Sequence, residues 1–212
     1  MDILQQLSEY LQSGDAKKVA ELTQHAITVK LDTKTILEEG LISGMAVIGE
    51  KFKCHEIFLP DVLLAAKAMY TGMDLLKPLL IKEGIPTIGK VVIGSVQGDL
   101  HDIGKNLVAI MLKGAGFDVI DLGNDVSPQK FIDTAENENV DVIGMSALLT
   151  TTMPVMKKVV DLARERGLYG KKKFIVGGAP LSSEYAKEIG ADAYCFDGVS
   201  AVETVKRFVG IN

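Results

Sequence analysis

The sequence is poor in the residues that mark several classes of protein. Its 212 residues include no tryptophan and only 2 cysteines, Cys54 and Cys195, which lie far apart and form no closely spaced pair. This spacing disfavours a disulfide framework or a zinc site and fits a reducing cytosol. Proline is scarce as well, with 6 residues, while 47% of the chain is hydrophobic. Such a composition argues against a disordered chain and is typical of a packed globular protein.

Positive charge is also in the minority. The 23 lysines and arginines are outnumbered by 28 aspartates and glutamates, and only residues 171–173 form a basic run. A nucleic-acid binder needs a basic surface, so we expect no nucleic-acid partner. No apolar stretch approaches the roughly 18 residues of a bilayer span. Residues 1–7 carry an acid and no base, so we expect neither membrane insertion nor export, and a location in the cytoplasm.

Helical periodicity dominates the first part of the chain. One stripe with helical spacing is Leu37, Leu41, Met45, Ile48 and Phe52. Asp15 and Asp32 suit helix N-caps, and Pro60 suits a first helical turn. Gly40 and Gly44 lie one turn apart and would allow a close contact between helices. We predict four helices, at residues 2–13, 15–30, 33–52 and 60–78.

The pattern changes near Gly84 and Pro86, where we place a boundary between a helical domain, residues 1–84, and a second domain, residues 85–212. Beyond it, short β-rich runs alternate with amphipathic helical stretches. The predicted strands are residues 90–96, 118–122, 140–146, 173–177 and 192–196. This alternation predicts a doubly wound parallel sheet with helices on both faces, and five strands favour the flavodoxin-like order 2-1-3-4-5.

A doubly wound sheet binds its ligand beyond the carboxyl ends of the strands, where the strand order reverses. Here the reversal lies between the first and third strands, so the loops after Val96 and Met145 matter most. The first loop includes residues 98–104. Its glycines have the wrong spacing for a dinucleotide fingerprint, and the sequence has no P-loop motif. The loop instead holds His101 between two aspartates.

Asp99 and His101 have the spacing of a carboxylate–imidazole pair. A neutral imidazole can bind a transition metal through one nitrogen while the other nitrogen donates to a carboxylate, which fixes the ring. The alternative is a surface histidine beside its carboxylate. The position at the predicted reversal of strand order favours the metal ligand.

Two further loops carry hydroxyls or glycines. The loop after the third strand contains Ser146, Thr150 and Thr152. One hydroxyl could serve only to cap the next helix, which leaves the others free for a polar ligand. Gly177 and Gly178 end the fourth strand, where glycine suits either an ordinary turn or the close approach of a ligand.

Together these residues resemble the cobalamin-binding signature. The matching segments are Asp99-x-His101-x-x-Gly104, Ser146-x-Leu148 and Gly177-Gly178. Residues 44–52 and 58–60 are similar to the four-helix cap of methionine synthase and of methyltransferase corrinoid proteins. The resemblance covers nearly the whole chain. It is nearest to the free-standing corrinoid proteins of methanol, methylamine and methoxy-aromatic methyltransferase systems.

The resemblance implies a role for each matching residue. His101 would take the lower axial position on the cobalt of cobalamin or a related corrinoid, Asp99 would hold its far ring nitrogen, and Thr152 would complete the relay. Phe52 and Leu59 would cover the cobalt-bound methyl group, unless they only pack helices. The other residues implied to bind the cofactor are Gly98, Leu100, Asp102, Ile103, Gly104, Ser146, Leu148, Thr150, Gly177, Gly178 and Asp197.

The resemblance also implies a function. The chain would accept a methyl group on cobalt from a small C1 donor through one methyltransferase. It would pass the group to a second methyltransferase for a thiol or a tetrahydrofolate-type acceptor, with a reductive activator as a further partner. The length leaves no room for a substrate barrel, so we expect a carrier that is not catalytic by itself. The alternatives are a cobalamin-dependent mutase subunit, which leaves the cap unexplained, and a cobalamin-sensing regulator, for which we find no DNA-binding module.

Overall fold

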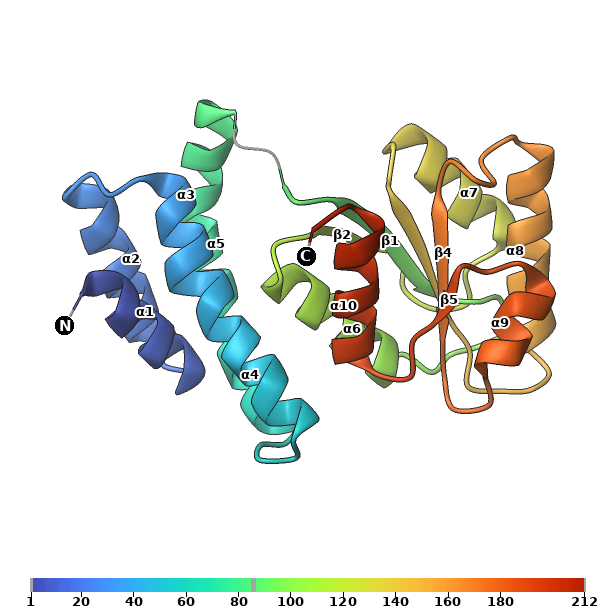
Figure 1. Cartoon of the computed structure of the whole chain (residues 1–212), viewed down its shortest axis with the longest axis horizontal. Coiled ribbons are helices and arrows are strands. Elements are labelled where there is room, and N and C mark those ends of the chain that lie inside the picture. Colours follow the sequence, from blue (N-terminus) through green and yellow to red (C-terminus); the bar gives the residue numbers. More distant parts are fainter. Residues whose placement is uncertain (1, 85–86, 212) are drawn as a thin grey trace. The chain divides into compact units, whose positions relative to one another are not determined.

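The computed structural model describes residues 2–84 and 87–211 (Figure 1). The chain divides into two compact units, residues 1–87 with 114–116 and residues 88–113 with 117–212. We call them the helical unit and the sheet unit. The boundary predicted between residues 84 and 85 adjoins residues 85 and 86, which lie outside the described residues, and it stays a prediction.

Four runs of helix make up the described part of the helical unit. They are α1 (Ile3–Gln12), α2 (Ala16–Thr28), the continuous run of α3 (Thr33–Thr35), η1 (Ile36–Ile42) and α4 (Ser43–Lys53), and α5 (Leu59–Glu83). Both predicted N-caps are confirmed. The Asp15 carboxylate accepts a hydrogen bond from the Lys18 amide at 3.0 Å, and the Asp32 carboxylate accepts one from the Thr35 amide at 2.8 Å. Pro60 lies in the first turn of α5, as predicted.

Two details of the helical unit differ from the prediction. The segment η1 is π-helical, and the Ser43 amide donates to the Glu38 carbonyl, five residues back. Apolar spacing does not reveal this, because the four-residue steps from Leu37 to Leu41 and from Leu41 to Met45 suit an α-helix and a π-helix alike. The predicted end of the last helix at residue 78 is wrong. Pro78 removes one hydrogen bond without ending the helix, which stops at Gly84 in a left-handed conformation.

The two glycines of the third helical run allow α1 to approach closely. A Cβ added to Gly40 would lie 2.6 Å from Cδ2 of Leu7, and one added to Gly44 would lie 3.0 Å from the Ser8 carbonyl oxygen. Both positions therefore need a residue without a side chain. The predicted packing role of these glycines is confirmed.

The sheet unit is a doubly wound parallel sheet, as predicted. Its strands are β1 (Lys90–Ser95), β2 (Asp118–Asp121), β3 (Val142–Ser146), β4 (Lys173–Gly177) and β5 (Ala193–Tyr194). They pair in parallel in the order β2-β1-β3-β4-β5, which confirms the flavodoxin-like topology. The chain passes from β1 to β2 on one side and from β3 to β4 on the other side, so the strand order reverses between β1 and β3, as expected. The loops after β1 and β3 both start at the carboxyl edge of the sheet.

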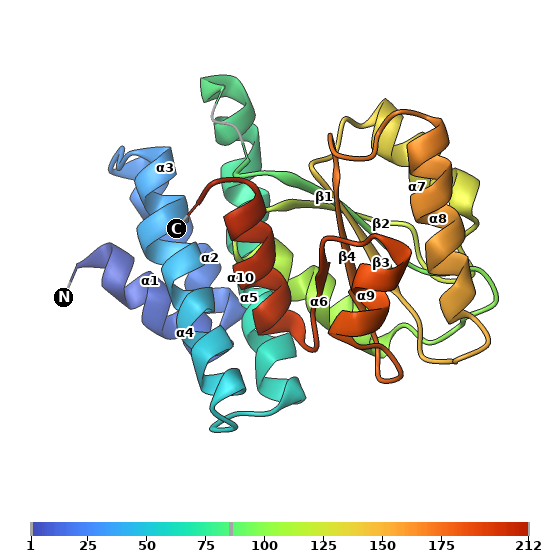
Figure 2. The same ribbon diagram turned by 45° about the vertical axis from the view of Figure 1, so that its right-hand side comes forward.

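Helices cover both faces of this sheet. They are α6 (Ile103–Gly114), α7 (Pro128–Asn137), α8 (Met153–Glu165), α9 (Ser183–Ile189) and α10 (Gly198–Phe208). In Figures 1 and 2, α6 and α10 lie on one face and α7, α8 and α9 on the other. The core under the second group includes the fully buried Phe131, Ile143 and Phe174. No helix in the described part of the chain combines the length and apolar character of a bilayer span.

Candidate functional site

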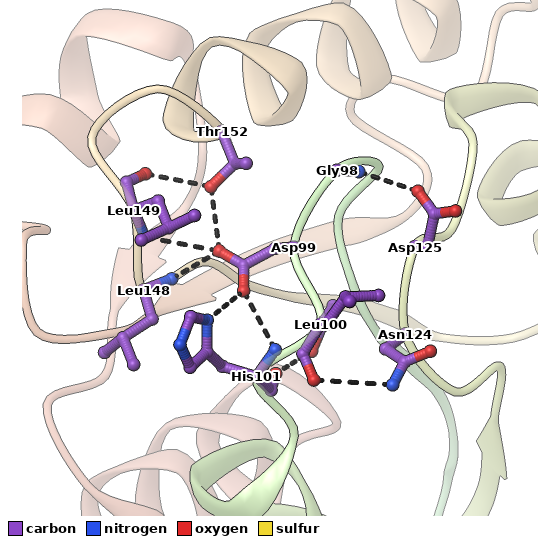
Figure 3. A network of polar contacts seen from close by, with 10 residues as sticks. Gly98, Asp99, Leu100, His101, Asn124, Asp125, Leu148, Leu149 and Thr152 are labelled. Carbon is purple, nitrogen blue, oxygen red and sulfur yellow. Dashed lines mark hydrogen bonds and ion pairs between the residues drawn. The ribbon is translucent and has the colours of Figure 1, made fainter.

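Asp99 and His101 lie together in the loop between β1 and α6 (Figure 3). Oδ1 of Asp99 accepts hydrogen bonds from Nδ1 of His101 at 2.8 Å and from the His101 amide at 3.1 Å. The Asp99 side chain is fully buried, whereas the His101 side chain is 51% exposed. The structure thus brings the two side chains of the predicted pair together, with the carboxylate inside and part of the ring at the surface.

The second oxygen of Asp99 is held by the loop that follows β3. Oδ2 accepts hydrogen bonds from the amides of Leu148 at 2.7 Å and Leu149 at 3.2 Å, and from the Thr152 hydroxyl at 2.8 Å. β1 and β3 are neighbours in the sheet. One buried carboxylate therefore joins the two loops that flank the reversal of strand order.

The pKa of the Asp99 carboxyl lies well below its ordinary value. Burial acts to raise it, because burial penalises the charged form, but hydrogen bonds from Leu148, Thr152 and His101 outweigh that effect. Asp99 is therefore ionised at neutral pH and can only accept hydrogen bonds. Nδ1 of His101 must carry the proton, so the lone pair of the neutral ring is on Nε2. Nε2 receives no hydrogen bond from any described residue.

Thr152 occupies the N-cap position of α8, yet its side chain makes no capping hydrogen bond. Its buried hydroxyl lies 2.8 Å from Oδ2 of Asp99 and 2.9 Å from the Leu149 carbonyl oxygen. A hydroxyl has a single proton, so it donates fully to only one of these acceptors at a time. The alternative that Thr152 serves only as a helix cap is therefore wrong.

Other hydrogen bonds hold the main chain of the same loop, and the sequence analysis did not anticipate them. The Ser95 hydroxyl, at the end of β1, donates to the His101 carbonyl at 2.6 Å. Asp125, after β2, accepts the Gly98 amide at 2.7 Å through its carboxylate and donates its own amide to the Asp99 carbonyl at 3.0 Å. No sequence motif marks these two residues, because their contacts are to main-chain groups.

The other polar residues that were predicted to bind the cofactor lie outside the Asp99 network. Ser146 is half-buried and Thr150 is exposed, and neither side chain forms a hydrogen bond within the described residues. Asp197 caps α10, because its carboxylate accepts the Ser200 amide at 2.7 Å. The Asp102 carbonyl accepts the Asn106 amide at the start of α6. Their predicted cofactor contacts stay predictions.

The predicted glycines have different surroundings. Gly178 has a φ of +137°, and an added Cβ would lie 1.8 Å from the Ala147 carbonyl oxygen, so a neighbouring loop of the chain itself requires glycine there. A Cβ on Gly177 would lie 3.0 Å from the Cys195 carbonyl oxygen. A Cβ on Gly104 would meet no described atom within 4 Å. Gly104 therefore leaves open space beside the first turn of α6.

Large apolar side chains are exposed at the carboxyl edge of the sheet. They are Leu100, Ile103, Leu148, Leu149 and Phe196, of which Ile103 and Phe196 are each 73% exposed. Figure 3 shows Leu148 next to the imidazole, with Leu149 above it in this view and the Leu100 side chain extending away from the ring. Exposed apolar residues gathered at one edge mark a binding surface. Leu149 and Phe196 were missed because a single leucine or phenylalanine in a loop carries no distinctive signal.

Phe52 and Leu59 belong to the helical unit, near the end of α4 and at the start of α5. Both are half-buried. Half burial suits a packing residue and a residue that covers a ligand equally well. The predicted contact of these two side chains with a cobalt-bound group stays a prediction.

Models of known protein families match both units. Residues 3–77 and residues 89–206 each match a family described as "B12 binding domain". A corrinoid protein of Desulfitobacterium hafniense is 41% identical over 99% of both chains. The dimethylamine corrinoid protein of Methanosarcina barkeri is 41% identical over 98% of both chains. The chain belongs to the family of B12-binding corrinoid proteins.

Solved structures agree with this assignment. The crystal structure of the methanol:cobalamin methyltransferase complex of Methanosarcina barkeri contains a chain with a TM-score of 0.88 and 29% identity, over 98% of this chain and 79% of that one. A cobalamin-binding protein of Desulfitobacterium hafniense has a TM-score of 0.80 and 30% identity, over 99% of this chain and 100% of that one. The cofactor of the family is cobalamin or a related corrinoid.

The residues at the sheet edge fit a corrinoid. A corrin ring supplies the equatorial nitrogens of its cobalt, so one protein imidazole is sufficient as a further ligand. The half-exposed His101 ring offers the lone pair of Nε2 for that position. The exposed apolar side chains suit the broad face of a macrocycle, and the open space at Gly104 leaves room beside it.

Proposed function

We propose that this chain is a corrinoid subunit that carries a methyl group between methyltransferases. When bound, the corrinoid supplies a cobalt that accepts a methyl group and releases it again. One observation carries the proposal: the buried Asp99 carboxylate orients His101 through Nδ1 and leaves Nε2 available at the sheet edge. The identity to corrinoid proteins over nearly the whole chain supports it and favours a carrier over a mutase subunit or a regulator.

His101 is the residue that would hold the cobalt, through Nε2. Asp99 keeps the imidazole in one tautomer and one orientation, and a carboxylate partner makes an imidazole a better metal ligand. Because the amides of Leu148 and Leu149 fix the Asp99 carboxylate, it cannot follow a rotation of the ring, so turning the ring would break the hydrogen bond between Nδ1 and Oδ1. The Asp99–His101 pair is thereby organised before the cofactor binds.

Thr152 would complete a relay behind the histidine. When its hydroxyl donates to Asp99, it draws charge from the carboxylate that Nδ1 also uses. When the hydroxyl turns to the Leu149 carbonyl, the carboxylate interacts more strongly with Nδ1. Rotation of the Thr152 hydroxyl between its two acceptors can thus adjust the electron density at Nε2 without movement of the backbone.

Partner proteins would supply the chemistry at both ends of the transfer. The structural similarity to a chain of the methanol:cobalamin methyltransferase complex supports a methyltransferase partner. We further propose that one methyltransferase delivers the methyl group from a small C1 donor. A second would pass it to a thiol or a tetrahydrofolate-type acceptor, and a reductive activator would restore the corrinoid. The location in the cytoplasm stays a prediction.

The absorption spectrum of the reconstituted protein tests the role of His101. We expect the wild-type chain to bind hydroxocobalamin and to give a spectrum that His101→Ala changes. His55→Ala is the matched control, because His55 is an exposed loop histidine of the helical unit and should leave the spectrum unchanged. Failure of the wild-type chain to bind any corrinoid would contradict the proposed function. A spectrum that His101→Ala leaves unchanged would contradict the ligand assignment.

A further inference from the structure

Ser95 and its surroundings fix one end of the histidine loop. Ser95 is fully buried, and its hydroxyl donates to the His101 carbonyl at 2.6 Å. Its amide donates to the Gly123 carbonyl, and its own carbonyl accepts the Val126 amide, both at 3.0 Å. Main-chain hydrogen bonds therefore fix Ser95, the last residue of β1, to the loop after β2. Through its hydroxyl, Ser95 in turn holds the main chain of His101 in place.

Asp125 fixes the other end of the histidine loop. Its carboxylate accepts the Gly98 amide at 2.7 Å, and its amide donates to the Asp99 carbonyl at 3.0 Å. Asp125 has a φ of +53°, a left-handed conformation that most residues avoid. The carboxylate and the amide of Asp125 thus both bind the histidine loop, and Figure 3 shows the contact of the carboxylate with Gly98.

An ion pair between a buried lysine and a partly exposed aspartate holds the segment that contains Asp125. Nζ of Lys105, a residue only 3% exposed, lies 2.5 and 2.6 Å from the two carboxylate oxygens of Asp121. Asp121 also accepts the Gly123 amide at 2.9 Å. Asp121 thus contacts both the buried Lys105 and the main chain of the loop after β2. It ties the loop after β2 to α6, the helix that follows His101.

We propose that Ser95 and Asp125 are positioning residues for His101. Asp99 fixes the side chain of His101, whereas Ser95 and Asp125 fix the main chain from which both the Asp99 and the His101 side chains extend. Together they set the direction in which Nε2 points. This inference rests on the proposed role of His101 as the cobalt ligand.

Two variants remove these contacts without overpacking the core or straining the backbone. Ser95→Ala removes the hydroxyl without adding volume, and Asp125→Gly removes the carboxylate while it tolerates the left-handed backbone. Asp125→Asn is the conservative variant, because its amide oxygen can still accept the Gly98 amide. Asn139→Ala is the matched control. Asn139 has a φ of +48° and accepts Lys172 Nζ, but it precedes β3 at the opposite edge of the sheet.

The measurement is the electron paramagnetic resonance spectrum of the full chain loaded with cobalt(II) cobalamin. The chain carries ¹⁵N-labelled histidine, so a histidine nitrogen on cobalt splits each line into a doublet, whereas a nitrogen of the cofactor splits it into a triplet. The doublet fraction therefore reports the ratio of histidine-ligated to histidine-free cofactor, and His101→Ala should show no doublet. We expect Ser95→Ala and Asp125→Gly to lower this ratio about fivefold each, the change in equilibrium that one lost hydrogen bond produces. Asp125→Asn and Asn139→Ala should keep the wild-type ratio.

Amide hydrogen exchange of the cofactor-free chain gives a second readout. Exchange at the Gly98 and His101 amides should become about fivefold faster in Ser95→Ala and Asp125→Gly, and should not change in Asn139→Ala. A wild-type ratio of ligated cofactor in both folded variants would overturn the inference. Absence of the histidine doublet in the labelled wild-type chain would instead contradict the proposed role of His101, so the two failures are distinguishable.

Discussion

The helical unit and the sheet unit present their predicted functional residues in opposite ways. In the helical unit, Phe52 and Leu59 are half-buried apolar side chains. In the sheet unit, Asp99 is fully buried, and its hydrogen-bond partners His101 and Thr152 belong to the same unit. A polar site can therefore be interpreted from its own partners, because each donor needs an acceptor. An apolar residue can be assigned only when the surface that covers it is known.

The largest effect should come from removing the centre of the polar network. Asp99→Ala leaves the amides of Leu148 and Leu149 and the Thr152 hydroxyl without their acceptor. We expect the free energy of unfolding of the sheet unit to fall by about 4 kcal/mol, because each donor left without an acceptor inside the protein costs about 1 to 3 kcal/mol. Urea unfolding, monitored in each unit by hydrogen exchange, would measure this loss of free energy.

The control for this prediction is a carboxylate that only caps a helix. Asp197→Ala removes the N-cap of α10 and should cost about 1 kcal/mol. The helical unit should keep its stability in both variants. Equal losses of unfolding free energy in the two variants would show that Asp99 stabilises the sheet unit no more than an ordinary helix cap does.

A somewhat smaller effect should separate two glycines of the signature. Gly178→Ala would place a Cβ 1.8 Å from the Ala147 carbonyl oxygen, and we expect a loss of about 2 to 3 kcal/mol in sheet-unit stability from overpacking and strain. Gly104→Ala meets open space and should change stability by less than about 1 kcal/mol. It should weaken corrinoid binding instead. Thermal unfolding and a corrinoid titration would together test this contrast.

Two threonines of one loop provide a third contrast. Thr152→Val removes a buried hydroxyl from Asp99 and should lower sheet-unit stability by about 1 to 2 kcal/mol. Thr150→Val makes the same change at an exposed residue and should have almost no effect on stability. Parallel denaturation curves of the two variants would measure the difference. Indistinguishable midpoints would mean that the Thr152 hydroxyl does not stabilise Asp99.

The smallest effect concerns reactivity rather than stability, and each unit has one cysteine. Cys54 is exposed, whereas Cys195 is buried. Burial raises the pKa of the Cys195 thiol to about 11, so little reactive thiolate forms at pH 8. A thiol reagent should modify Cys54 in the folded chain and Cys195 only after unfolding. Mass spectrometry of the modified chain would show a single label before unfolding, and early labelling of Cys195 would contradict its burial.

Much of the architecture follows from sequence patterns. The five strands and their order are predictable because β-rich runs alternate with helical stretches, and parallel sheets of this kind favour one topology. The π-helical segment at residues 36–42 is not predictable, because apolar steps of four residues suit both an α-helix and a π-helix. The continuation of α5 past Pro78 depends on local packing that spacing does not reveal.

The site is predictable where its chemistry lies in short motifs. Asp99 and His101 are two residues apart, so their pairing is visible in the sequence, and the hydroxyl of Thr152 follows from a loop at the adjacent strand end. Ser95 and Asp125 are not visible, because their contacts are to the main chain. Main-chain groups are the same at every residue, so a sequence motif cannot identify which of them a side chain will bind.

The most direct test of the central claim is isotopic. The full chain is produced with ¹⁵N-labelled histidine, loaded with cobalt(II) cobalamin, and compared with unlabelled protein by electron paramagnetic resonance. If His101 provides the axial nitrogen, the triplet splitting of the unlabelled protein becomes a doublet, and labelled His101→Ala shows no doublet. A triplet that survives labelling would mean that the nitrogen comes from the cofactor itself, and would contradict the assignment of His101 as the ligand.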